Sequence, residues 1–287
     1  MSVPKRPILR YFGGKWRIAP WIIRHLPPHD VYIEPFCGAA SVFFRKPRAR
    51  FGSVLNDTNG EIVNLFRILR NPVLSERLIA LLKLTPFARE ELLNARQPDD
   101  GLDPLERARR FVVRSQFGRG SCLLRNNTGF RSRRAHNSYP ARDWERYPDA
   151  LRDVVECLRG ETIENLPALS VIERYDGDNV LFYVDPPYPW GERRKKNEYA
   201  DGEMSDDDHR ALARTLKSVS GMVVLSGYRC ALMNELYGDW ERKELGTYDD
   251  GGKERTECLW LSPNTVRKLK NMESSLFGPD IEGGVLK

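Results

Sequence analysis

The strongest constraint on the fold is an alternation of short apolar runs with stretches of helical spacing. Two short strands are predicted at residues 31–33 and 51–55. From Glu61 onward apolar residues recur every three or four positions, which predicts a helix. Asn71-Pro72 ends this predicted helix, because proline cannot continue the hydrogen-bond ladder. Strand and helix in alternation are typical of a parallel sheet covered by helices.

A different composition interrupts this pattern in the middle of the chain. Residues 73–97 and 104–116 read as helical, and the Gly-, Asn- and Ser-rich stretch that follows is expected to be a loop or hairpin. The alternation then resumes with predicted strands at 180–184, 222–225 and 258–261, the last one antiparallel at an edge. A helix is predicted to start at Ser205, because a side-chain acceptor and the negative charges of residues 206–208 favour a first turn. We therefore predict one α/β domain built from residues 1–70 and 161–270. A mostly helical insertion would occupy 71–160, and a loose tail 271–287.

Composition narrows the classes of function. The 287 residues carry a formal net charge of +6, which favours an anionic partner. No apolar run approaches the roughly 18 residues that span a bilayer, so we expect no membrane partner. The five cysteines are scattered without metal-ligand spacing, as is usual for free thiols in a reducing cytoplasm. We expect a cytoplasmic protein without a metal.

The end of the first predicted strand has the features of a nucleotide site. Glu34, Pro35, Phe36 and Gly38 stand there, and Asp57 ends the next strand 19 residues after Gly38. Glycine allows close backbone approach to a ligand, and an acidic residue about 20 positions later can accept hydrogen bonds from ribose hydroxyls. The alternative is a strand-ending aspartate that caps a helix. The spacing is not G-x-G-x-x-G, which disfavours NAD or FAD.

A second glycine turn precedes the first strand. Tyr11 is followed closely by Gly13, Gly14 and Lys15. Two glycines let the backbone turn tightly and present a cation and amide donors to a ligand such as a carboxylate. The alternative is a flexible turn with a solvated lysine.

The third candidate segment follows the apolar run Val180–Val184 directly. Its residues are Asp185, Pro186, Pro187 and Tyr188. The prolines cannot donate to a sheet ladder, and they stiffen the backbone that carries the carboxylate and the aromatic ring. This favours a functional site, with an ordinary strand-ending turn as the alternative.

The order of these segments, FGGK, then EPFCG with NDxxxEIxxLF, then DPPY, resembles the Dam-type DNA adenine-N6 methyltransferases, including phage- or prophage-like members. The likeness covers most of the chain and extends to RNNTGFR, VVLSGY and RTECLWLSP. It implies a Rossmann-like S-adenosylmethionine-dependent methyltransferase fold with an inserted target-recognition domain. It also implies S-adenosyl-L-methionine as cofactor, double-stranded DNA as partner, no metal, and a monomer.

The resemblance assigns roles by position. It places the cofactor against Tyr11, Gly13, Gly14, Lys15, Glu34, Pro35, Phe36, Gly38, Asp57 and Asp185, with Asp57 on the ribose. It assigns catalysis to Asp185, Pro186, Pro187 and Tyr188. The Asp185 carboxylate and the Pro186 carbonyl would each accept one hydrogen of the adenine amine, held rigid by the prolines. Tyr188 would offer a stacking face to a base flipped out of the duplex.

The arginine-rich stretch suits contacts to DNA. Residues 107–134 hold nine arginines and no acidic residue, and arginine binds phosphate as well as the O6 and N7 atoms of guanine. The candidate DNA-binding residues are Arg119, Arg125, Asn126, Asn127, Arg131, Arg133 and Arg134. Arg125 and the two asparagines are the expected base reader, and the alternative is that the arginines touch only phosphate or solvent. The basic residues 193–196 are placed to close over the site, or else form a solvated charge run.

The motifs are also compatible with two other functions. The first is methylation of an RNA base or of protein glutamine by the same chemistry. The second is DNA binding by a protein whose catalytic site has degenerated. The target GATC is suggested only at the level of the family.

Overall fold

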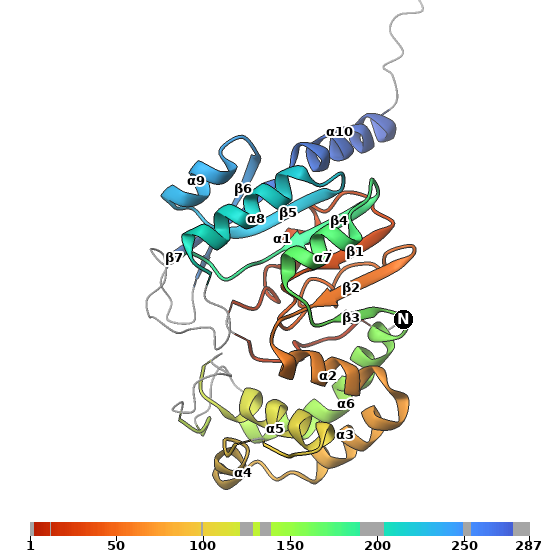
Figure 1. Ribbon diagram of the computed structural model, residues 1–287. Coiled ribbons are helices and arrows are strands. Elements are labelled where there is room, and N and C mark those ends of the chain that lie inside the picture. The colour runs from red at the N-terminus through yellow and green to blue at the C-terminus, as the bar shows by residue number, and fades with distance from the viewer. Residues whose placement is uncertain are drawn as a thin grey trace, which may run out of the picture.

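The computed structural model describes residues 3–11, 13–98, 100–120, 129–132, 139–189, 204–248 and 254–277. Within these ranges, seven strands form one sheet in the order β3-β2-β1-β4-β5-β7-β6, seen in the upper half of Figure 1. The α/β class predicted from the sequence is confirmed. The strands are β1 Val31–Glu34, β2 Gly52–Asn56, β3 Thr162–Glu164, β4 Val180–Val184, β5 Met222–Tyr228, β6 Glu241–Tyr248 and β7 Glu254–Leu261.

The connections of the sheet diverge between β1 and β4. The strands from β3 to β5 run parallel, and Ile33 of β1 pairs with Val54 of β2 on one side and Phe182 of β4 on the other. The chain leaves β1 for β2 in one direction, and it leaves β4 for β5 in the other. In open α/β sheets, ligands bind at such a switch point, outside the carboxyl ends of the strands.

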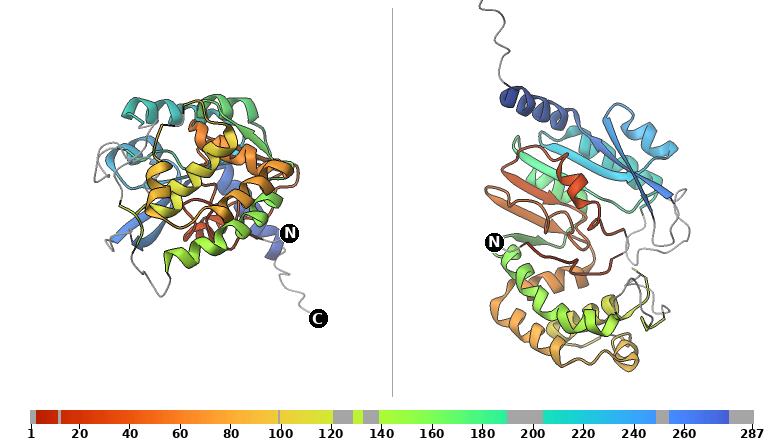
Figure 2. Two further views of the ribbon diagram at one scale, coloured as in Figure 1. Left: turned by 90° about the horizontal axis from the view of Figure 1, so that it is seen from below. Right: turned by 180° about the vertical axis from the view of Figure 1, so that it is seen from behind.

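Helices cover both faces of the sheet, which explains the apolar run of β4. Phe182 and Val184 pack with the helices α7, α8 and α9, whereas Leu181 and Tyr183 face the layer that contains α1. All of β4 is buried, as expected for a parallel strand covered on both sides. Figure 2 shows α1 on the face opposite to α8. The helices of these layers are α1 Ala19–Ile23, α7 Ala168–Tyr175, α8 Asp206–Ser218, α9 Ala231–Tyr237 and α10 Pro263–Phe277.

The predicted start of α8 at Ser205 is confirmed by its capping box. The backbone N–H of Asp208 donates to Ser205 Oγ at 3.2 Å, and the Ser205 N–H donates to Asp208 Oδ2 at 2.8 Å. Each bond satisfies an N–H that the helix itself leaves without a partner.

A group of helices lies below the β3 edge of the sheet in Figure 1. α2 stands between these helices and the sheet, in contact with β3 and with α3, α5 and α6. Along α6, Trp144, Tyr147, Leu151 and Val154 are buried at helical spacing. The helices are α2 Gly60–Arg70, α3 Pro72–Leu84, α4 Arg89–Asn94, α5 Pro104–Phe117 and α6 Pro140–Leu158.

The N-terminal residues 3–11 cross this helical group before they reach the sheet. The Tyr147 hydroxyl of α6 donates to the carbonyl of Ile8 at 2.6 Å. The Arg10 N–H donates to Ser115 Oγ of α5 at 2.8 Å. The segment therefore packs against the inserted helices, although it leads directly into the glycine turn at 13–15.

Three local predictions were wrong or incomplete. β7 is antiparallel as predicted but is not the edge, because β6 pairs along its outer side. The helix α6 was not predicted. α10 runs to Phe277, so the tail predicted to be loose from Asn271 begins as helix, and 278–287 lie outside the described residues. No helix among the described residues is long and apolar enough to cross a membrane.

Candidate active site

The loops that follow β1 and β2 are joined by one carboxylate. Gly38 N–H donates to Asp57 Oδ2 at 2.8 Å, and Asn59 N–H donates to Asp57 Oδ1 at 2.9 Å. Gly38 has a φ of +48°, and a Cβ at this position would lie 3.0 Å from the ring of Tyr11. Burial raises the pKa of Asp57, which these two amide donors oppose. Asp57 thus orders both loops and stays partly exposed at their surface.

Glu34 at the end of β1 points into the protein. Its Oε1 accepts from the Tyr32 hydroxyl at 2.7 Å and from the Phe43 N–H at 2.9 Å. The residue is 2% exposed, and burial raises its pKa to about 8. Its side chain therefore holds the loop from inside, while Phe36 and Gly38 are the members of this loop with partial exposure.

Lys15 is buried rather than solvated. It is 6% exposed, and its ammonium donates to the Gly13 carbonyl at 2.9 Å. The same nitrogen lies 3.0 Å from Asp185 Oδ1 and 3.5 Å from Glu257 Oε1. The glycine turn thus places the Lys15 ammonium at the carboxyl end of β4. The alternative of a solvated lysine is wrong.

Asp185 is held through one oxygen only. Oδ1 faces Lys15 and lies 3.1 Å from the Tyr188 hydroxyl. Within the described part of the chain, neither Asp185 Oδ2 nor the Pro186 carbonyl accepts a hydrogen bond. The Asp185 side chain is 19% exposed. Two acceptors on a stiff backbone therefore remain available at the switch point of the sheet.

Tyr188 lies deeper than the sequence suggested. It is 8% exposed, its hydroxyl donates to Glu257, and the Lys15 ammonium stands 4.8 Å from its ring centroid. The Tyr228 ring meets it edge-on at 4.7 Å. The expected stacking face is thus largely covered, and Tyr228, which is less buried, forms the adjoining aromatic surface.

Sequence reasoning missed Ser226 and Glu257. Ser226 Oγ of β5 donates to Glu257 Oε1 of β7 at 2.9 Å, and both side chains are buried. The available signal was a glutamate placed directly before the apolar run CLWL, where a charge is costly unless it is paired.

Comparison with known proteins identifies the family. The D12 class N6 adenine-specific DNA methyltransferase family matches residues 11–248. The chain belongs to this family. It is 28% identical over 254 residues to a DNA adenine methylase of Haemophilus influenzae, covering 84% of this chain and 85% of the relative. It is also 28% identical over 272 residues to the type II methyltransferase M1.LlaDCHI of Lactococcus lactis subsp. cremoris, covering 86% and 90%. The chain is thus an adenine-specific DNA methyltransferase, and such an enzyme acts with a methyl donor.

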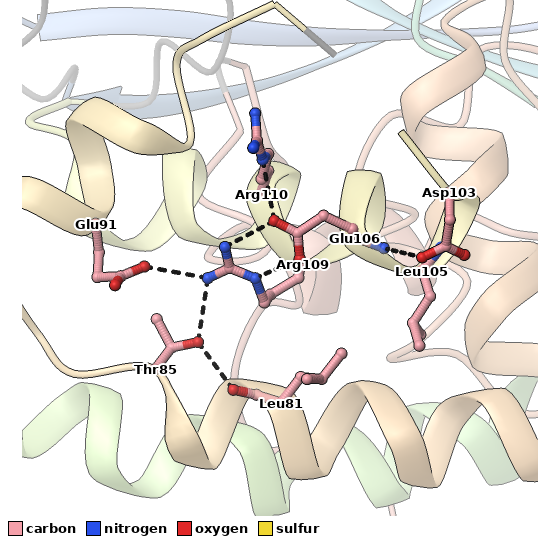
Figure 3. Close-up of polar contacts among 8 residues, drawn as sticks. All are labelled: Leu81, Thr85, Glu91, Asp103, Leu105, Glu106, Arg109 and Arg110. Carbon is pink, nitrogen blue, oxygen red and sulfur yellow. Dashed lines mark hydrogen bonds and ion pairs between the residues drawn. The ribbon is translucent and has the colours of Figure 1, made fainter. Parts of the chain in front are cut away.

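In this D12 class enzyme, much of the arginine-rich stretch is engaged inside the helical group. Figure 3 shows the Arg109 guanidinium between Thr85 directly after α3, Glu91 on α4 and Glu106 on α5. It donates to Glu106 Oε2 at 2.7 Å, and to Glu91 Oε2 and Thr85 Oγ1 at 3.2 Å each. Arg110 donates to the same Glu106 at 3.0 Å. Arg109 connects three helices and Arg110 pairs within α5, so the expectation that the whole stretch contacts DNA is too broad.

Two further arginines also have partners within the chain. Arg107 of α5 pairs with Glu61 of α2, which ties the helical group to the helix beside the sheet. Arg131, one of the candidate DNA-binding residues, lies 2.5 Å from Asp143. Arg119 is exposed at the base of a bridge between Gly118 and Phe130.

The remaining candidates for DNA contact lie outside the described residues. They are Arg125, Asn126, Asn127, Arg133 and Arg134, together with the basic residues 193–196. The Gly118–Phe130 bridge is antiparallel, which agrees with a hairpin at its base. No cluster of three potential metal ligands occurs among the residues described, and the expectation of a metal-free enzyme stays a prediction.

Proposed function

We propose that this enzyme transfers the methyl group of S-adenosyl-L-methionine to the N6 amine of an adenine flipped out of duplex DNA. The observation that carries the proposal is the state of Asp185. Its Oδ1 is held by Lys15 and lies beside the Tyr188 hydroxyl, while its Oδ2 and the neighbouring Pro186 carbonyl have no donor in the described chain. An amine with two N–H groups matches two such acceptors.

The loops at the switch point suit the proposed donor. Gly38 has no side chain, which lets the Tyr11 ring pack directly against this loop where a Cβ would otherwise lie. Asp57 presents a partly exposed carboxylate beside Gly38, as a ribose hydroxyl requires. When bound, S-adenosyl-L-methionine supplies an electrophilic methyl group on a sulfonium. We assign Tyr11, Gly38 and Asp57 to its binding, with Phe36 beside them.

The chain's own contribution to catalysis is orientation of the amine. The lone pair of the adenine N6 is delocalised into the ring, which makes it a poor nucleophile. Hydrogen bonds to Asp185 Oδ2 and the Pro186 carbonyl favour a pyramidal nitrogen and aim its lone pair. Pro186 and Pro187 keep these acceptors in place, so little reorganisation is needed during the reaction. Removing the base from the duplex costs a few kcal/mol.

The inserted helices are the proposed DNA-recognition unit. Of the candidate residues, Arg119 is exposed next to the bridge between Gly118 and Phe130 and suits a phosphate contact. Base reading is assigned to Arg125, Asn126 and Asn127, which the sequence places between Arg119 and Arg131. Arg131 is shared with Asp143 and is therefore a weaker candidate.

The test is incubation of the protein with isotopically labelled S-adenosyl-L-methionine and duplex DNA. We expect label in N6-methyladenine, and base-resolved sequencing of the product gives the target site. Parallel reactions contain RNA or total cell protein in place of DNA. Label in RNA bases or in glutamine, with none in DNA, would reject the proposal.

A further inference from the structure

We propose that Glu257 is a positioning residue for methyl transfer: it draws the Tyr188 hydroxyl and part of the Lys15 charge away from Asp185. The inference rests on the proposed function, because its purpose is to keep Asp185 a strong acceptor for the amine. Glu257 does not reach the open Oδ2 of Asp185, so it acts through its neighbours.

The fold brings Glu257 to this place from a distant part of the sequence. β7 pairs with β5 so that Glu257 stands opposite Tyr228, next to the carboxyl end of β4. The residue is 4% exposed and begins the buried half of its strand, directly before the apolar run Cys258–Leu261. A buried carboxylate is costly unless it is hydrogen-bonded and paired, and here one oxygen meets Tyr188, Ser226 and Lys15.

The first consequence concerns a single proton. The Tyr188 hydroxyl lies within reach of Asp185 Oδ1 at 3.1 Å and still closer to Glu257 Oε1, yet a hydroxyl donates only once. The shorter contact favours donation to Glu257. Asp185 is then relieved of one donor.

The second consequence concerns charge. The Lys15 ammonium lies between Asp185 Oδ1 at 3.0 Å and Glu257 Oε1 at 3.5 Å, so its charge is divided between two carboxylates. Without Glu257 it would neutralise Asp185 alone, and a neutralised carboxylate accepts hydrogen bonds more weakly. Burial raises the pKa of Asp185, Lys15 lowers it, and Glu257 raises it. The other titratable groups that act on Asp185 are Glu34, Tyr32, Tyr183, Tyr188 and Tyr228.

The experiment is the pH profile of kcat for Glu257→Gln, with duplex DNA as substrate. Glutamine still accepts from Tyr188 and Ser226 but lacks the charge. We expect kcat to fall about 10- to 100-fold with DNA affinity unchanged, because an acceptor is weakened rather than removed. The acid limb of the profile should move to lower pH, since loss of a neighbouring negative charge lowers the pKa of Asp185. Glu244→Gln, an exposed change on β6, is the matched control.

A second variant and a second measurement complete the test. Glu257→Asp draws the carboxylate back by one methylene, so the changes in kcat and in the acid limb should be smaller. If Glu257→Gln does not fold, the test is made with Glu257→Asp. The titration of Asp185 by NMR of 13C-labelled carboxyl groups, without substrate, reports the same shift independently of catalysis. It therefore separates failure of this inference from failure of the proposed function. A folded variant with a wild-type kcat and an unmoved Asp185 titration would overturn the role of Glu257.

Discussion

The backbone N–H of Gly38 donates a 2.8 Å hydrogen bond to Oδ2 of Asp57, and this bond joins the loops that follow β1 and β2. The two residues are 19 positions apart, yet parallel strands bring both to one edge of the sheet. A single carboxylate therefore sets the shape of the loop that we assign to the methyl donor.

Gly38→Ala should weaken donor binding more than it weakens the fold. The left-handed backbone costs alanine about 1–2 kcal/mol, and the new Cβ would stand 3.0 Å from the Tyr11 ring. Gly101→Ala is the matched control, because Gly101 has a φ of +75° with nothing within 4 Å. Calorimetric titration with S-adenosyl-L-methionine measures donor affinity, and unfolding in urea measures stability. Equal donor affinity in both variants would contradict the assignment of Gly38.

Asp185→Ala should lower the rate of methyl transfer by at least about 10²-fold, the usual cost of losing one preorganised hydrogen-bonding group. DNA affinity should change little, because Asp185 holds the amine rather than the phosphates. Single-turnover transfer and fluorescence anisotropy with labelled duplex measure the two quantities. Asp207→Ala, at the exposed start of α8, controls for a general effect of charge. If the alanine variant transfers at the wild-type rate, Asp185 has no part in the mechanism.

Arg119→Ala should weaken DNA binding, whereas Arg109→Ala should lower the stability of the fold. Loss of Arg119 should reduce the salt dependence of DNA binding by about one unit of slope and leave stability unchanged, as expected for an exposed phosphate contact. Loss of Arg109 should cost about 1–3 kcal/mol of stability, because Glu106 and Glu91 lose a charged partner. Affinity at several salt concentrations and thermal unfolding distinguish them. Weaker DNA binding by a fully stable Arg109 variant would assign that residue to the interface.

Glu34 should make the enzyme less stable as pH rises. Its folded pKa is about 8 against an ordinary value of 4.5, so between these values the folded state holds a proton that the unfolded state releases. The stability that comes from this Glu34 proton is therefore fully present below about pH 4.5 and is lost progressively toward pH 8. Glu34→Gln, which can still accept from Tyr32 and Phe43, should flatten this part of the curve. The free energy of unfolding in urea at pH 5 and 7.5 checks it, and parallel curves for both proteins would exclude Glu34 as the cause.

The sequence predicted what depends on local pattern. β4 was predicted with its observed bounds because Val180–Val184 is apolar on both faces. The start of α8 was predicted because Ser205 offers a side-chain acceptor and Asp206–Asp208 place negative charge in the first turn. DPPY and EPFCG stood out because glycine and proline restrict the backbone within a few residues.

What escaped prediction depends on pairing between distant segments. β6 carries Glu241, Arg242, Lys243 and Glu244, and such charges look like a loop until β7 supplies the ladder. α6 contains Pro148, which disguises its periodicity. Glu257 could not be placed near Asp185 without the register of β5 and β7. The pairing of Arg109 with Glu91 likewise needs α4 and α5 side by side.

The N-terminal residues 3–11 have a mechanical consequence for the enzyme. They are bonded to α5 and α6 through Arg10 and Ile8, and only five residues further on stands Lys15. A stretch of that length spans at most about 18 Å, so Lys15 lies close to the contacts of this segment with the helical group. Movement of the proposed DNA-recognition helices would therefore act, over a short length of chain, on the ammonium beside Asp185. Residues 3–15 thus form a short covalent link between the helical group and the site around Asp185.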